Sequence, residues 1–204
     1  MTKTFLDRAY DLDAPERTRA FYADWSESYD EEVSENGYAT PRRAAILLAA
    51  RVDDKDAPLL DLGCGTGISG TSFHDAGFTT IDGTDLSPEM LAKAEAKGVY
   101  RSLQETDAAD PLPFDAGLYP TIAAIGVFSP GHAPPDTIDH VLNKLTPGGR
   151  FVFSFNDHTL EDPAYEGRVR EWADCGAVIV EAREEGDHLP RIGIKSVVYV
   201  LRRL

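Results

Sequence analysis

The spacing of hydrophobic residues changes along the chain from a helical to a strand-like pattern. Over residues 14–51 the spacing is helical, because apolar and aromatic residues recur every four positions on one helix face. These residues are Phe21, Trp25, Tyr29 and Val33. Asn36-Gly37 interrupts the pattern, and Pro41 suits the first turn of a second helix that ends near Val52. The segment therefore predicts helices ahead of the first strand.

Short apolar runs alternate with amphipathic stretches from Pro58 to the end of the sequence. The apolar runs predict strands near residues 58–62, 78–84, 99–103, 118–125, 149–155, 177–183 and 195–202. The stretches between them predict helices near residues 67–76, 88–97, 134–145 and 163–174. Ser87-Pro88-Glu89 indicates a helix start, since it combines an N-cap residue, a first-turn proline and an early acid. Pro147-Gly148-Gly149 stops the preceding helix and turns the chain into a strand.

This alternation predicts the α/β class, with a doubly wound, mainly parallel sheet of seven strands. Only a short loop with Gly186 separates the last two strands, so we expect an antiparallel hairpin at or near one end of the sheet. Asp187-His188 falls in that loop, where surface residues are expected. A chain of 204 residues suits a single domain over 1–204. We divide it into an N-terminal helical cap over 1–40 and a sheet-containing core over 41–204.

Glycines follow the first predicted strand in the run Asp61-Leu62-Gly63-Cys64-Gly65-Thr66-Gly67. Glycine lets the backbone turn sharply and approach a ligand where a Cβ atom would collide. Residues 65–70 also satisfy G-x-G-x-x-G, with Asp85 about 20 residues further on, so an NAD- or FAD-binding oxidoreductase is an alternative. Asp61 argues against it. A carboxylate at this place would repel a pyrophosphate, whereas it suits a ligand with an ammonium group.

Further blocks follow the glycine run in a fixed order. They are Thr84 to Leu91, Asp107, and Leu145 to Arg150. Together the four blocks resemble the class I S-adenosylmethionine-dependent methyltransferases over roughly residues 40–155. The resemblance implies a Rossmann-like core, S-adenosyl-L-methionine as cofactor, and an enzyme that transfers its methyl group. Residues 21–40 resemble the N-terminal cap helices of the small-molecule branch, which implies a small-molecule acceptor and a contact from Tyr29 to cofactor or substrate.

The resemblance implies roles for the residues after the first two strands. Asp61 would act on the ammonium of the methionine moiety, through water or the loop backbone. Gly63, Gly65 and Gly67 would let the loop run beneath the methionine and the ribose. Asp85 would accept hydrogen bonds from both ribose hydroxyls, as a carboxylate can.

It also implies contacts to the adenine and the sulfonium. Leu86 and Met90 would enclose the adenine ring. Asp107 would accept from the adenine amino group, while the backbone N–H of Ala108 would meet a ring nitrogen. Ile125, at the end of the fourth strand, would lie near the sulfonium.

Composition and charge narrow the expected partners. The net charge is −15, and a phosphate backbone would be repelled by the average field, so we expect no nucleic-acid partner. No apolar run approaches the ~20 residues of a membrane span, so no membrane partner is expected. Two cysteines form no disulfide framework, which favours a cytoplasmic location. The five histidines lack metal-ligand spacing, and no metal is expected.

His132 is the candidate catalytic residue. It follows the fourth strand, at the carboxyl edge where ligands bind in open α/β sheets. An imidazole there can take a proton from an acceptor, although the surrounding Ser129-Pro130-Gly131 and Pro134-Pro135 are also typical of an exposed loop. Methyl transfer itself is an in-line displacement that depends mainly on positioning. The family usually has Phe-Asp before the fourth strand, where this sequence has Leu118-Tyr119-Pro120, so a non-catalytic cofactor-binding module is a further alternative.

Overall fold

The computed structural model describes residues 25, 27–107, 111–130 and 132–204. Its sheet has seven strands in the order β3-β2-β1-β4-β5-β7-β6. The strands are β1 Leu59–Leu62, β2 Ile81–Asp85, β3 Ser102–Glu105, β4 Thr121–Ala124, β5 Arg150–Asn156, β6 Val178–Leu189 and β7 Ile194–Arg203. Strands β1 to β5 pair in parallel, and β7 runs antiparallel to both β5 and β6. The predicted α/β sheet with a C-terminal antiparallel hairpin is confirmed.

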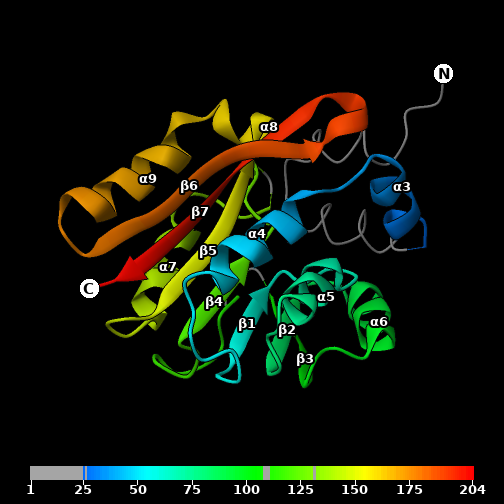
Figure 1. Cartoon of the computed structure of the whole chain (residues 1–204), viewed down its shortest axis with the longest axis horizontal. Helices are drawn as coiled ribbons and strands as arrows, with labels where there is room; N and C mark the ends of the chain where they lie inside the picture. Colours follow the sequence, from blue (N-terminus) through cyan, green and yellow to red (C-terminus); the bar gives the residue numbers. More distant parts are fainter. Residues whose placement is uncertain (1–24, 26, 108–110, 131) are drawn as a thin grey trace.

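Helices pack around this sheet (Figure 1). They are α3 Tyr29–Glu35, α4 Thr40–Ala49, α5 Ile68–Asp75, α6 Pro88–Lys97, α7 Thr137–Lys144, α8 Asp157–Leu160 and α9 Pro163–Asp174, with the 3₁₀ turn η1 Pro190–Ile192. Helices α6 and α9 begin and end at the predicted residues, because local caps fix their starts. The Ser87 hydroxyl accepts from the Met90 N–H, and the Asp162 carboxylate accepts from the Ala164 N–H. None of the helices in this part of the chain combines the length and apolarity that a membrane crossing requires.

The sheet separates two apolar clusters, one on each face. Successive side chains of a strand point to opposite faces, so Leu60 and Leu62 of β1 join the cluster under α7 and α9. Leu59 joins the cluster under α4 and α5. Asp61, on the same side as Leu59, is completely buried near the start of α5. Burial of a carboxylate here follows directly from the two-residue period of the strand.

The hairpin extends further than the sequence predicted. Strand β6 continues to Leu189, so His188 is not a surface loop residue but is 7% exposed. The Oγ1 of Thr40, the first residue of α4, lies 2.8 Å from both His188 Nδ1 and Ser196 Oγ. Burial lowers the pKa of His188 to about 4, so its imidazole is neutral at neutral pH. The hairpin and the first core helix are therefore joined by a buried hydrogen-bond network, to which the Arg43 guanidinium adds a bond to Ser196 Oγ at 3.0 Å.

The predicted N-terminal helix is interrupted earlier than expected. A turn at Glu27 and Ser28 precedes α3, so Trp25 and Tyr29 do not lie on one continuous helix. They still pack together with Val33. Phe21 lies outside the described residues. The division at residue 40 into cap and core stays a prediction.

Candidate active site

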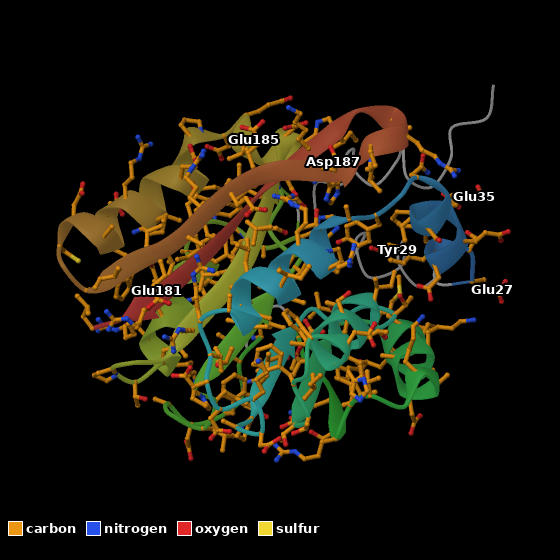
Figure 2. The ribbon with its side chains drawn as sticks, in the orientation of Figure 1. Glu27, Tyr29, Glu35, Glu181, Glu185 and Asp187 are labelled. Carbon is orange, nitrogen blue, oxygen red and sulfur yellow. The ribbon has the colours of Figure 1, made fainter. Side chains whose placement is uncertain are left out.

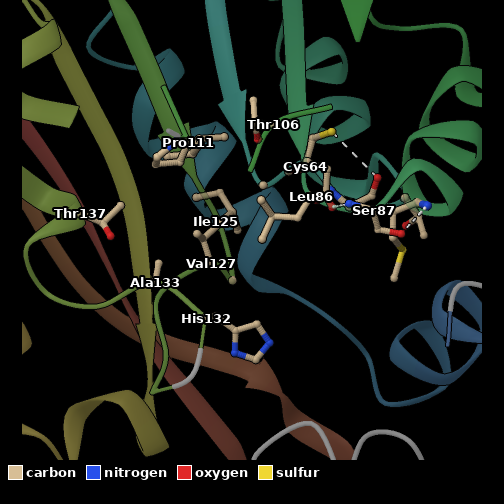
Figure 3. Close-up of a pocket in the computed structure, with 18 of the residues that line it drawn as sticks. Cys64, Leu86, Ser87, Thr106, Pro111, Ile125, Val127, His132, Ala133 and Thr137 are labelled. Carbon is tan, nitrogen blue, oxygen red and sulfur yellow. Dashed lines mark hydrogen bonds between the residues drawn. The ribbon is translucent and has the colours of Figure 1, made fainter. Parts of the chain in front are cut away.

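A cavity of about 310 Å³ opens at the carboxyl ends of β1, β2 and β4. Most of the predicted site residues line it: Tyr29, Gly63, Gly65, Asp85, Leu86, Met90, Ile125 and His132. Figure 3 shows Cys64, Leu86 and Ser87 on one side of this cavity and His132 and Ala133 on another. The glycine run and the loop after β4 therefore share one cavity.

Two backbone N–H groups fix the Asp85 carboxylate at the cavity wall. The Gly65 N–H donates to Oδ2 at 2.8 Å, and the Ser87 N–H donates to Oδ1 at 2.9 Å. Burial raises the pKa of Asp85, and these two hydrogen bonds offset part of the rise. The structure thus brings the last residue of β2 and the glycine run together. An acceptor oriented in this way suits a ligand with hydroxyl donors.

Asp61 lies behind the glycine run and does not itself line the cavity. The hydroxyls of Ser69 and Tyr100 both donate to its Oδ2, at 2.7 and 2.8 Å. Its Oδ1 is buried and has no hydrogen-bond partner within the described residues. Burial raises the pKa of Asp61 to about 6. A nearby cation would favour the ionised carboxylate, so this atom suits a positively charged ligand group.

Gly70 explains why the dinucleotide pattern occurs without a dinucleotide site. A Cβ atom at Gly70 would lie 2.2 Å from the Tyr100 hydroxyl, and the Gly70 N–H donates to the same oxygen at 3.2 Å. The third glycine therefore makes room for the tyrosine that binds Asp61. Since the Gly65 N–H is already bound to Asp85, it is not offered to a pyrophosphate.

The other predicted residues differ in their placement. Gly67 ends the glycine run as the N-cap of α5, with a φ of 89° that favours glycine. Asp107 is exposed and is absent from the cavity lining, whereas its neighbour Thr106 lines it. Ala108 lies outside the described residues. The contacts assigned to these residues stay predictions.

His132 lies where the sequence placed it, in the loop after β4. Its Nδ1 is 2.6 Å from the hydroxyl oxygen of Ser129, and the side chain lines the cavity (Figure 3). Burial lowers the pKa of His132 to about 4. The imidazole is therefore neutral at neutral pH rather than a titrating surface group. Its catalytic role stays a prediction.

Sequence reasoning missed the residues that support the carboxylates. Tyr100 lies 39 residues from Asp61 in the sequence, and nothing in its surroundings marks it as a partner. Tyr38 also lines the cavity, and its hydroxyl lies 2.7 Å from where a Cβ atom of Gly126 would be. The sequence marked Tyr38 only as part of Gly37-Tyr38, within the segment 21–40 that resembles the N-terminal cap.

Comparison with known families decides the assignment. Residues 30–197, well over half of the chain, match the model of a family described as a methyltransferase domain. The chain belongs to the class I S-adenosylmethionine-dependent methyltransferases. S-adenosylmethionine is thus the cofactor, and the alternative of a nicotinamide or flavin oxidoreductase is excluded.

The residues present fit this cofactor. The unpartnered Oδ1 of buried Asp61 suits the ammonium group. A Cβ atom at Gly65, which lines the cavity, would meet no atom within 4 Å, so the run leaves open space there for a ligand. Asp85 lies fixed beside that space as an acceptor.

Curated relatives carry several methyltransferase names. The human methyltransferase-like protein 27 is 34% identical over 132 residues, which cover 63% of this chain and 54% of that protein. A probable 18S rRNA (guanine-N(7))-methyltransferase of Dictyostelium discoideum is 33% identical over 124 residues, which cover 55% of this chain and 43% of that protein. The chain spans about half the length of these relatives.

Solved structures share the fold at low sequence identity. A putative methyltransferase in complex with the Haloferax volcanii Trm112 activator has a TM-score of 0.67 at 20% identity, covering 91% of this chain and 98% of that one. A methyltransferase from Thiobacillus denitrificans in complex with S-adenosyl-L-homocysteine has a TM-score of 0.60 at 15% identity, covering 82% and 92%. At these identities the likeness concerns the fold alone.

The exclusion of nucleic acid as a partner was wrong. The relatives include proteins named as 18S rRNA and tRNA U34 modifying enzymes, although the net charge here is −15. Net charge describes the average field and not the part of the surface that binds a ligand. Figure 2 shows acidic side chains such as Glu27 and Glu35 at α3 and Glu185 and Asp187 along β6. None of these four lines the cavity.

Proposed function

We propose that the chain transfers a methyl group from S-adenosylmethionine to a small-molecule acceptor that enters the cavity between the loop after β4, α7 and the cap. The observation that carries the proposal is that one cavity joins the cofactor residues to a second wall made by Tyr29, Tyr38 and His132. An acceptor against this second wall would lie beside the residues assigned to the sulfonium. The proposed location is the cytoplasm, as the cysteine usage favours.

The cavity residues act by positioning. Bound S-adenosylmethionine supplies an electrophilic methyl group on its sulfonium, and Asp61 and Asp85 would hold its two polar ends. Holding the acceptor in line with the methyl carbon can lower the barrier by about 7–11 kcal/mol. The aromatic rings of Tyr29 and Tyr38 would exclude water from the acceptor, since both line the cavity.

His132 would receive the proton that the acceptor loses. Its low pKa keeps the imidazole neutral at neutral pH, so the proton-accepting form is present throughout that range. His132 is thus a weak base, and a weak base suffices for an amine acceptor, because the nitrogen becomes positively charged and acidic as the methyl group is transferred to it. The hydroxyl of Ser129, 2.6 Å from Nδ1, would hold the ring orientation.

RNA is the second candidate acceptor class. The names of the rRNA and tRNA relatives favour it. The methyl acceptor would then be a single base flipped out of its stack into the cavity, because an enzyme reaches the atoms of a stacked base only in this way. The two candidates differ in the size of the acceptor and share the cofactor site.

The test measures S-adenosylhomocysteine production with separate panels of amines, phenols and carboxylic acids, and with total RNA. Mass spectrometry then identifies the methylated product. Turnover with a small molecule supports the proposal, whereas turnover with RNA alone replaces it by the second candidate. Cofactor binding in calorimetry without turnover in any panel would favour a non-catalytic module.

A further inference from the structure

One carboxylate of the N-terminal cap contacts both the glycine run and a core helix. Asp30, the second residue of α3, accepts a hydrogen bond from the Thr66 hydroxyl with Oδ1 and pairs with Lys97 Nζ through Oδ2. Thr66 belongs to the glycine run, is 2% exposed and lines the cavity. Lys97 is the last residue of α6. Three segments that are distant in the sequence therefore meet at one side chain.

A separate apolar contact holds the rest of α3. Trp25, Val33 and Leu189 form a small buried cluster, and Tyr29 packs against it with its ring centroid 4.6 Å from that of Trp25. Figure 2 shows Tyr29 on the inner side of α3, whereas Glu35 lies on its outer side. Because Leu189 ends β6, this cluster attaches the helix to the hairpin. The hydrogen bond of Asp30 is thus an additional contact, directed at the glycine run.

The two contacts of Asp30 differ in what they can do. An ion pair of half-exposed groups such as Asp30 and Lys97 contributes little to stability. The Thr66 hydroxyl is different, because a buried hydroxyl needs an acceptor and Asp30 supplies it. The residue before Thr66 is Gly65, whose N–H orients Asp85. A displacement of α3 would therefore alter the loop that orients the Asp85 carboxylate, the group assigned to the ribose hydroxyls.

We propose that Asp30 is a positioning residue that couples the cap to the cofactor loop. By accepting from the Thr66 hydroxyl, Asp30 holds α3 and the glycine run in the relative position that binds the cofactor. Tyr29, the neighbour of Asp30, then forms its part of the cavity wall only when the loop is correctly placed. The coupling concerns the cofactor site, so its test is independent of which acceptor the enzyme uses.

The test compares S-adenosylhomocysteine affinity in matched variants by calorimetry. Asp30→Ala should weaken binding about tenfold, within the usual range for coupled sites, and the free protein should stay folded although the buried Thr66 hydroxyl loses its acceptor. Glu31→Ala is the matched control, since it removes the same charge from the same helix turn at an exposed position and should bind within twofold of wild type. Asp30→Asn, which keeps an oxygen to accept from Thr66, should restore most of the affinity.

A double-mutant cycle with Thr66→Val tests the route. If Asp30 acts through the hydroxyl, Asp30→Ala should cost much less affinity in the Thr66→Val protein than in wild type. The proposal is overturned if Asp30→Ala costs as much affinity in the Thr66→Val protein as in wild type. It is also overturned if Glu31→Ala weakens binding as much as Asp30→Ala does, or if Asp30→Ala binds normally. The emission of Trp25, recorded in a Trp172→Phe background, reports the cap directly. It should shift to the red in Asp30→Ala and return toward wild type on saturation with S-adenosylhomocysteine.

Discussion

Asp61→Asn should stabilise the free protein and weaken cofactor binding at the same time. Burial raises the pKa of this carboxyl from its ordinary value of 3.8 to about 6, a difference that corresponds to roughly 3 kcal/mol needed to ionise it in place. An asparagine keeps an oxygen to accept from Ser69 and Tyr100, as Oδ2 does now. Its amide nitrogen takes the place of Oδ1, the atom without a partner. The substitution therefore removes the charge with little change in shape.

The raised pKa of Asp61 determines whether its ionisation stabilises or destabilises the folded protein. Between about pH 4 and pH 6 the folded protein holds the Asp61 proton while the unfolded chain has released it. This residue's contribution to the free energy of unfolding thus falls as the pH rises through that window and is constant above it. Asp61→Asn should abolish that decline and raise the free energy of unfolding at pH 7.5 by up to about 3 kcal/mol, less the cost of burying amide N–H groups that have no acceptor at the position of Oδ1.

Cofactor binding should respond in the opposite direction. The ionised carboxylate attracts the ammonium group, so wild-type affinity for S-adenosylhomocysteine should fall as the pH drops below about 6. Asp61→Asn should remove this pH dependence and weaken binding at pH 7.5 by at most about 1.5–3 kcal/mol, the value for a direct hydrogen bond to a charged group, because Asp61 acts from behind the glycine run. Urea unfolding and calorimetry from pH 4.5 to 8 measure both effects.

Asp82→Asn is the matched control. Asp82 is also a buried strand carboxylate, but hydrogen bonds from Arg101, Ser102 and Tyr119 outweigh the effect of burial and lower its pKa. Its replacement should destabilise the free protein at pH 7.5 and leave S-adenosylhomocysteine affinity unchanged. If Asp61→Asn instead destabilised the protein and bound the cofactor normally, the carboxylate would be structural and the reasoning refuted.

Three further substitutions test the rest of the site. Asp85→Ala should cost about 1.5–3 kcal/mol of cofactor affinity in calorimetry with little effect on stability; normal binding would place the ribose contact elsewhere. Tyr100→Phe should raise the pKa of Asp61 further, since its hydroxyl now donates to that carboxylate, and the decline in cofactor affinity at low pH should begin at a higher pH. His132→Ala should lower turnover about 10²-fold at unchanged cofactor affinity. His158→Ala, at the same sheet edge, is the control and should keep its turnover; an equal loss of turnover in both variants would remove His132 from the mechanism.

Local signals predicted those parts of the structure that depend on neighbouring residues. The start of α6 at Pro88 followed from its cap residue Ser87, and the structure confirms the cap. Asp85 was placed correctly at the end of β2, because a strand end is a local property. The N–H groups that orient its carboxylate were not predicted, although Gly65 belongs to the glycine run.

Contacts between distant segments escaped prediction. Tyr100 reaches Asp61 because Gly70 leaves space for its ring, and this space exists only once α5 is packed on the sheet. The sequence predicts His188 in a surface loop, because the short spacing around Gly186 gives no sign that β6 continues to Leu189. Its burial depends on Thr40, 148 residues away. Such pairings require the three-dimensional arrangement of the elements.

The bond between Thr40 and His188 has a consequence for biosynthesis. A nascent chain emerges from the ribosome in sequence order, and its N-terminal parts usually fold first. Here the start of α4 obtains its buried partners only after the hairpin of β6 and β7 has emerged, because Thr40 binds both His188 and Ser196. The cap wall of the cavity is attached to the same hairpin through Leu189. The cap wall of the cavity can therefore form only after the chain has been translated beyond Ser196, whereas β1, β2 and the glycine run between them are available much earlier.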